Sequence, residues 1–94
     1  MSPADVPVGP VLVECDESRA VIAAIRELNA DVSVRDRGAY LRVEVPRRCV
    51  VTREAIEHRL GRSFELPTAL ERIMPSFSGT FSVSADMASW EARR

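Results

Sequence analysis

The 94-residue sequence predicts an α+β fold: a small single domain with a mostly antiparallel sheet and two to three helices. Three observations predict this class. A chain of this length forms one domain around one modest core. Apolar and polar residues alternate in several short runs, as they do in half-buried strands. The helical stretches fall between these runs without the regular alternation of a parallel sheet, in the order β-α-β-β-(β)-α-α-β-β.

The N-terminal region predicts a tail and a first strand. Residues 1–7 contain two prolines and few apolar side chains, so we expect a short flexible tail before a single domain over residues 8–94. Residues 8–15, VGPVLVEC, form a β-rich run. Pro10 has no backbone N–H, so it is expected at the start of this strand or on a sheet edge.

The first helix is predicted between Asp16 and Asn29. Asp16 is a favourable N-cap residue, and Asn29 is a plausible terminator. Apolar residues between them recur at helical spacing and predict one buried stripe, made of Val21, Ile22, Ile25 and Leu28.

A hairpin follows the first helix. Residues 32–35 alternate as a half-buried strand, and Asp36-Arg37-Gly38 has the composition of a turn in which Gly38 takes a positive φ. Residues 40–45 give the clearest alternation in the chain, with Leu41, Val43 and Val45 directed to one face. A short extended segment is expected at residues 49–51.

Two more helices and two strands complete the prediction. Thr52 is the expected N-cap of the second helix, and Gly61 its left-handed C-terminal residue. A short third helix starts near Thr68 and must end at Pro75. The last elements are a loop over residues 76–79, a strand with Phe81 and Val83, and a final strand with Trp90. The residues expected to be buried around the third helix are Phe64, Leu66, Leu70, Ile73 and Met74.

Composition excludes several functional classes. The formal net charge of -1 gives no basic excess for binding nucleic acid. All 13 cationic residues are arginine, whose planar guanidinium suits bidentate pairing with partner carboxylates. No apolar run is long enough to span a membrane and no signal peptide is evident, so a cytoplasmic protein is expected. Cys15 and Cys49 lie in apolar runs and are expected to be buried free thiols.

No catalytic or metal-binding constellation stands out. The one histidine, His58, follows Glu54 at i+4, whereas a di-iron helix needs Glu and His at i and i+3, twice, in a four-helix bundle. Two isolated cysteines do not make a zinc site. The four glycines are isolated, so no phosphate-binding loop is predicted. These observations favour a binding or regulatory protein without metal or cofactor over an enzyme.

Four stretches carry a resemblance to a known family. They are VGPV at residues 8–11, V-x-V-x-D-R-x-A-Y at 32–40, T-R-E with L-G-R-x-F at 52–64, and SFSG at 76–79. In this order and spacing the chain resembles the small effector, or coupling, proteins of soluble multicomponent di-iron monooxygenases. That family serves methane, phenol, toluene and alkene oxidation, and the toluene and alkene members are the most similar.

The resemblance implies a non-catalytic subunit that binds the hydroxylase α-subunit near its di-iron centre. There it would tune substrate access, oxygen activation and coupling in aromatic or alkene catabolism. A Rieske ferredoxin and a reductase would be functional partners, and the free protein would be a monomer with no cofactor of its own. The positions that match the family's contact regions are Pro75, Ser76, Phe77, Tyr40, Arg42, Arg37 and Arg53.

Two points stay open at this stage. Phe77 either anchors the interface with the hydroxylase or packs in the core of its own domain. The alternative function is a small-molecule-sensing regulatory domain, dimeric, with a ferredoxin-like βαββαβ sheet. Gel filtration separates the two functions, because the effector is expected to be a monomer and the sensor an obligate dimer.

Overall fold

The computed structural model describes residues 6–93. Residues 1–5 of the expected tail lie outside this range, and Pro7 already belongs to the first strand. The elements, in chain order, are β1 (Pro7–Val13), α1 (Asp16–Leu28), β2 (Ser33–Asp36), β3 (Tyr40–Pro46), β4 (Arg48–Thr52), α2 (Arg53–Leu60), α3 (Thr68–Ile73), β5 (Ser76–Ser78), β6 (Thr80–Val83) and β7 (Met87–Glu91).

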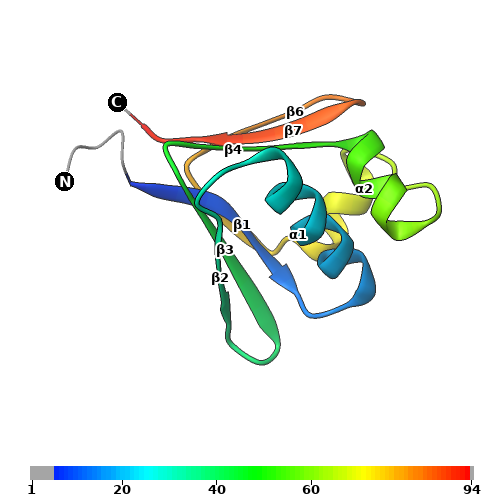
Figure 1. Cartoon of the computed structure of the whole chain (residues 1–94), viewed down its shortest axis with the longest axis horizontal. Helices are drawn as coiled ribbons and strands as arrows, with labels where there is room; N and C mark the ends of the chain where they lie inside the picture. The colour runs from blue at the N-terminus through cyan, green and yellow to red at the C-terminus, as the bar shows by residue number, and fades with distance from the viewer. Residues whose placement is uncertain (1–5, 94) are drawn as a thin grey trace.

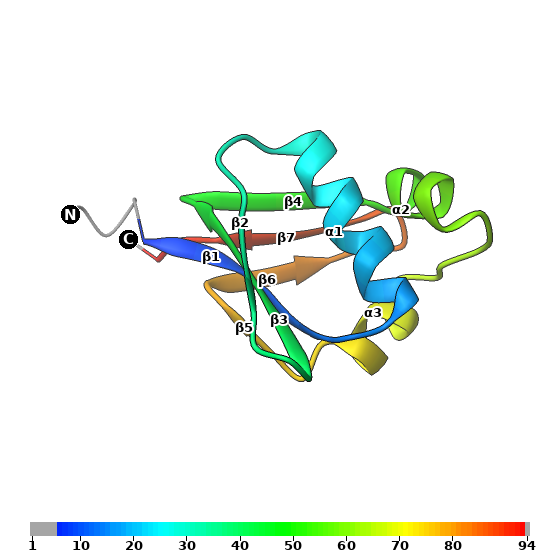
Figure 2. The same cartoon turned by 60° about the horizontal axis from the view of Figure 1, so that its bottom comes forward.

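The strands form two sheets whose pairings are antiparallel. One sheet has the order β2-β3-β1-β5, and the other has the order β4-β7-β6. The start of β1 and the end of β7 lie at one end of the molecule, and α2 lies at the other (Figures 1 and 2). The α+β prediction is confirmed, whereas the single ferredoxin-like sheet of the alternative is not the arrangement seen.

Two bends pass the chain from one sheet to the other. β3 continues into β4 through Arg47, at φ 67°, and β5 continues into β6 through Gly79, at φ 97°. A Cβ atom at Gly79 would lie 2.7 Å from both the Glu91 carbonyl oxygen and Val8 Cγ1. The strand ends are therefore packed so closely at this bend that only glycine fits without a shift.

Pro10 is an interior residue of β1, so the expectation of a strand start or an edge is wrong. It is buried and lies opposite Phe77 of β5. The pairs that join β1 to β3 include Val8 with Val45 and Val11 with Arg42, and skip Gly9 and Pro10. Since the ladder is interrupted at this point, the missing N–H of Pro10 breaks no pair.

Helix α1 begins at Asp16, the residue expected to be its cap, and so starts one residue earlier than predicted. The N-cap residue is Cys15, which makes no side-chain capping bond, and Asp16 is the first helical residue, placed near the positive end of the dipole. Val21, Ile22 and Ile25 are buried as predicted. Leu28 is 42% exposed, because it lies in the last turn of α1 and lines an open hollow beside the bend between β3 and β4.

The side chain of Asn29 joins the end of α1 to the outer edge of β4 by hydrogen bonds. Its side-chain nitrogen donates to the Ile25 carbonyl at 2.8 Å and to the Val50 carbonyl at 2.7 Å. Its side-chain oxygen accepts from the Val50 N–H at 3.0 Å. The amide thus satisfies the backbone of an edge strand and adds a second hydrogen bond to the Ile25 carbonyl, which already accepts from the Asn29 N–H, so asparagine suits the end of this helix.

The predicted hairpin turn and both predicted ends of α2 are confirmed. Gly38 has φ 84°, and its N–H donates to Asp36 Oδ1 at 2.8 Å. The Ala55 N–H donates to Thr52 Oγ1 at 3.2 Å at the start of α2. Gly61 ends α2 in the left-handed conformation. These local signals fix where the hairpin and the second helix begin and end.

Residues 76–79, expected as a loop, contain the short strand β5. Ser76 lies opposite Val11 and Ser78 opposite Gly9 of β1. The alternation Ser-Phe-Ser suits a strand, and β1 offers an open edge on the side away from β3. This edge comes from the other end of the sequence, so the local pattern of serine and glycine did not indicate it.

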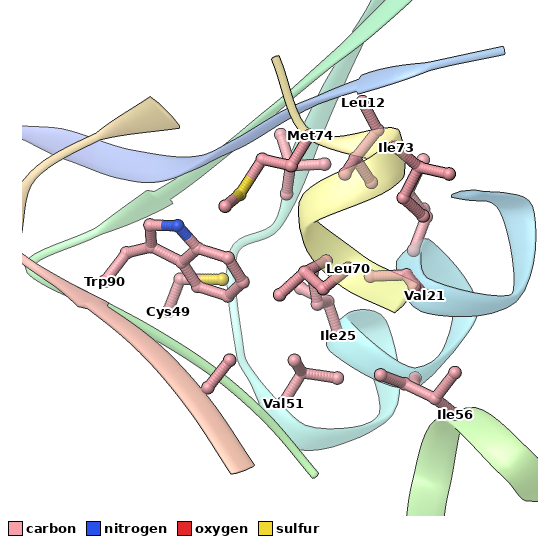
Figure 3. Packing of buried hydrophobic residues seen from close by; sticks show 14 of the residues in the cluster. Leu12, Val21, Ile25, Cys49, Val51, Ile56, Leu70, Ile73, Met74 and Trp90 are labelled. Carbon is pink, nitrogen blue, oxygen red and sulfur yellow. The ribbon is translucent and has the colours of Figure 1, made fainter. Parts of the chain in front are cut away.

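The core lies between the two sheets and the helices. Trp90 of β7 and Cys49 of β4 are fully buried and lie near Met74 in Figure 3, with Leu70, Ile25 and Val51 beyond them. Burial raises the pKa of the Cys49 thiol to about 12. Cys15 is only half-buried, because it lies at the start of α1 and not in a strand.

Candidate partner-binding surface

The Glu54–His58 segment has a structural role. The Glu57 carboxylate accepts from the Phe64 N–H at 2.8 Å and from Arg53 Nε at 2.9 Å, and so ties the loop after α2 back to the helix. His58 is exposed on α2. Within residues 6–93, no three His, Cys, Asp or Glu side chains are grouped so that they could hold a metal ion.

Glu57→Gln is expected to make thermal stability less dependent on pH in the acid range. The hydrogen bond from the Phe64 N–H, followed by that from Arg53, lowers the pKa of Glu57. The stabilisation is therefore complete above the pKa of an unfolded glutamate, about 4.3, and is lost as pH falls through the lower native pKa. Melting temperatures between pH 7 and 3 measure this loss. Glu54→Gln, at an exposed position of the same helix, is the control, and a Glu57→Gln curve parallel to wild type would contradict the assignment.

Several residues singled out in the sequence share the outer face of the four-stranded sheet. Arg42 of β3 and Ser76 of β5 lie on either side of Val11 in one row across the strands. Arg42 Nη2 donates to Ser78 Oγ at 3.2 Å, so the guanidinium reaches across β1 to β5. Tyr40, two residues before Arg42, is 47% exposed on the same face.

Phe77 is a surface residue at the edge of this sheet. It is 45% exposed, although its neighbours along β5 point to the opposite face. Its ring lies 5.2 Å from the ring of Phe81, and Phe81 stacks on Trp90 at 5.3 Å. This aromatic column runs from solvent through a half-buried ring to a fully buried one, so the inner side of Phe77 is supported while its outer side is free.

The remaining predicted contacts divide into two groups. Pro75 is exposed immediately before β5, and Arg37 is exposed in the turn between β2 and β3, where its N–H donates to the Tyr40 carbonyl at 2.8 Å. Arg53 lies apart from them on α2, paired with Glu57. Helix α2 lies at the helical end of the molecule, apart from β5 (Figure 2).

A hollow beside Phe77 contains residues that the sequence did not single out. It measures about 660 Å³ and lies where β1 starts and β5 turns into β6. Its lining residues are Val6, Pro7, Val8, Arg42, Glu44, Phe77, Ser78, Gly79, Ala92 and Arg93. Glu44 could have been found from its i+2 spacing to Arg42, whereas the C-terminal residues come from the other sheet and carry no local signal.

The sequence between residues 6 and 91 matches the MmoB/DmpM family model. This match spans nearly the whole chain. The chain belongs to the MmoB/DmpM family. The resemblance to effector proteins that was read from the four sequence stretches is thereby confirmed.

Individual relatives agree with this assignment. The chain is 44% identical over 85 residues to the effector subunit of the alkene monooxygenase system of Xanthobacter autotrophicus, an alignment that covers 88% of this chain and 83% of that protein. It also superimposes on chains from two structures of the phenol hydroxylase–regulatory protein complex. The first match has a TM-score of 0.81 at 26% sequence identity, and covers 93% of this chain and 99% of the other. The second match has a TM-score of 0.75 at 27% sequence identity, and covers 90% of this chain and 98% of the other.

In the described part of the chain, no helix has the length and apolar character needed to cross a membrane.

Proposed function

We propose that this protein is a non-catalytic effector subunit of a multicomponent monooxygenase and that it binds the hydroxylase component. The observation that carries the proposal is the 44% identity to an alkene monooxygenase effector subunit over most of both chains. The likeness to chains from a hydroxylase–regulatory protein complex supports it independently. The proposed activity is hydrocarbon oxidation by the hydroxylase, with this subunit as regulator.

The mode of regulation follows from linkage. A subunit with no reacting groups can change catalysis only by binding two states of the hydroxylase with different affinity. We place the contact on the hydroxylase α-subunit near its di-iron centre, where a shift between states alters substrate access, oxygen activation and coupling. The iron belongs to the hydroxylase, and the effector supplies binding free energy.

The contact surface is proposed to be the outer face and edge of the four-stranded sheet. Phe77 is its anchor, because a large aromatic side chain supported from below and free above has the character of an interface hot spot. Pro75, Ser76, Tyr40, Arg42 and Arg37 surround it. Arg53 belongs to a more distant, secondary contact.

The wider system is proposed to include a Rieske ferredoxin and a reductase, which deliver electrons to the hydroxylase. The protein is proposed to act in the cytoplasm and to be monomeric when free. These assignments follow from the family resemblance.

Reconstitution tests the proposal. Adding the purified protein to its hydroxylase, ferredoxin and reductase is expected to raise turnover and the ratio of product formed to NADH consumed. The protein alone is expected to oxidise no substrate. Turnover and coupling that do not change with effector concentration would contradict the function.

A further inference from the structure

The hollow beside Phe77 combines an apolar floor with an excess of positive charge. Val8, Pro7 and Gly79 form the apolar part, and the Phe77 ring forms one wall. Arg42 and Arg93 are the cationic residues of the lining, and Glu44 is the one acidic residue among the described residues that line it. A volume of about 660 Å³ accommodates more than one side chain of a partner.

Glu44 is already neutralised from another strand. Arg35 Nε of β2 lies 2.7 Å from Glu44 Oε1, whereas Arg42 Nε is 3.9 Å from Glu44 Oε2. Since Arg35 is the closer partner of the Glu44 carboxylate, the guanidinium of Arg42 can pair with a carboxylate of another protein. Its hydrogen bond to Ser78 is to a neutral hydroxyl and fixes the direction of the guanidinium without compensating its charge.

We infer that this hollow binds an acidic side chain of the hydroxylase, a glutamate or aspartate beside an apolar residue, with Arg42 as the residue that recognises the carboxylate. The inference rests on the proposed function. The guanidinium offers a planar pair of donors for the carboxylate, and the hydrogen bond from Arg42 Nη2 to Ser78 Oγ fixes its orientation. The apolar neighbour packs against Phe77, which excludes water from the charged pair and strengthens it.

Binding of the hydroxylase to Arg42 variants tests this inference. Arg42→Gln is expected to weaken binding about 10-fold at low salt and to make the dissociation constant less sensitive to salt, because one charge contact is removed. The affinity of Arg42→Lys is expected to lie between those of wild type and Arg42→Gln, since lysine keeps the positive charge but lacks the planar pair of donors. Fluorescence anisotropy of labelled effector between 50 and 300 mM NaCl measures both quantities.

Two controls separate recognition from a structural role. Ser78→Ala removes the hydrogen bond that orients Arg42 but leaves the charge of the guanidinium, so it is expected to weaken binding less than Arg42→Gln and to keep the wild-type salt dependence. Equal changes in affinity and salt dependence in Ser78→Ala and Arg42→Gln would show that Arg42 only positions β5. Arg59→Gln, on α2, removes an exposed ion pair with Glu27 and is expected to bind as wild type does.

The outcomes distinguish this inference from the function on which it rests. If Phe77→Ala weakens binding while Arg42→Gln changes neither affinity nor its salt dependence, the carboxylate site is wrong and the effector function stands. If the wild-type protein does not bind the hydroxylase at all, the function itself is wrong.

Discussion

Phe77→Ala is expected to weaken binding to the hydroxylase by about 1–4 kcal/mol, or roughly 5- to 800-fold in the dissociation constant. Effector-dependent turnover should fall in parallel at limiting effector concentration. The cause is the loss of a large apolar anchor that is 45% exposed in the free protein and held from below by Phe81. At a saturating concentration of the variant, part of the turnover should return. The reason is that the substitution lowers the affinity for the hydroxylase more than it lowers the turnover of the hydroxylase–effector complex.

The fold should survive this substitution. Phe77 lies on the edge strand β5 and contacts the half-buried Phe81, so its removal opens no closed cavity and leaves the stacking of Phe81 on Trp90 in place. A native far-ultraviolet spectrum and a melting temperature within a few degrees of wild type are therefore expected. A collapsed melting transition would show instead that the Phe77 ring is needed to close the two sheets.

Leu28→Ala provides a matched control for Phe77→Ala. Leu28 is an apolar residue of similar exposure, 42%, but it lies at the end of α1, away from β5. The Leu28→Ala variant should bind the hydroxylase with wild-type affinity. Equal losses in the two variants, measured by the same titration, would mean that the contact surface is not centred on β5.

The hairpin and the second helix could be predicted because their signals are local. The strand at residues 40–45, the turn at Gly38, the cap at Thr52 and the stop at Gly61 each depend on neighbours a few residues away. Alternation, side-chain capping and positive φ are properties that a short window of sequence contains.

The errors in the strands occurred where distant segments meet. The strand β5 exists because β1 offers it an edge, and Pro10 is tolerated because the β1–β3 ladder is interrupted where it lies. Both facts depend on pairings between residues far apart in the sequence. The bends at Arg47 and Gly79, which divide the strands between two sheets, likewise have no local signature beyond one glycine.

The residues of the candidate surface could be named from the sequence, but their relative positions and the hollow beside them could not. The resemblance placed Phe77, Tyr40 and Arg42 among the contacts, and the fold brings Arg42 to β5 through Ser78. It also places Arg53 at the start of α2, an element that lies apart from β5. The hollow at the bend could not be foreseen, because its walls come from β1, β3, β5 and the segment after β7.

Gly9→Ala is expected to cost about 2–6 kcal/mol of unfolding free energy, combining backbone strain with overpacking. Gly9 has φ 146°, a conformation that side-chain-bearing residues rarely adopt, and an added Cβ would lie 2.5 Å from the Val43 carbonyl oxygen. That oxygen belongs to the backbone of β3, the neighbour of β1 in the sheet, so relief requires two paired strands to separate. Against a typical total of about 5–15 kcal/mol, this loss is severe.

Gly38→Ala isolates the backbone part of this cost. Gly38 also has a positive φ, 84°, but no atom lies within 4 Å of a Cβ built there, so the expected loss is about 1–2 kcal/mol. Urea denaturation of both variants at 25 °C measures the difference, provided that the dependence on denaturant is unchanged. A Gly9→Ala variant no less stable than Gly38→Ala would mean that β1 and β3 can move apart at little cost. The close approach of Gly9 to the Val43 carbonyl would then not determine the geometry of the sheet.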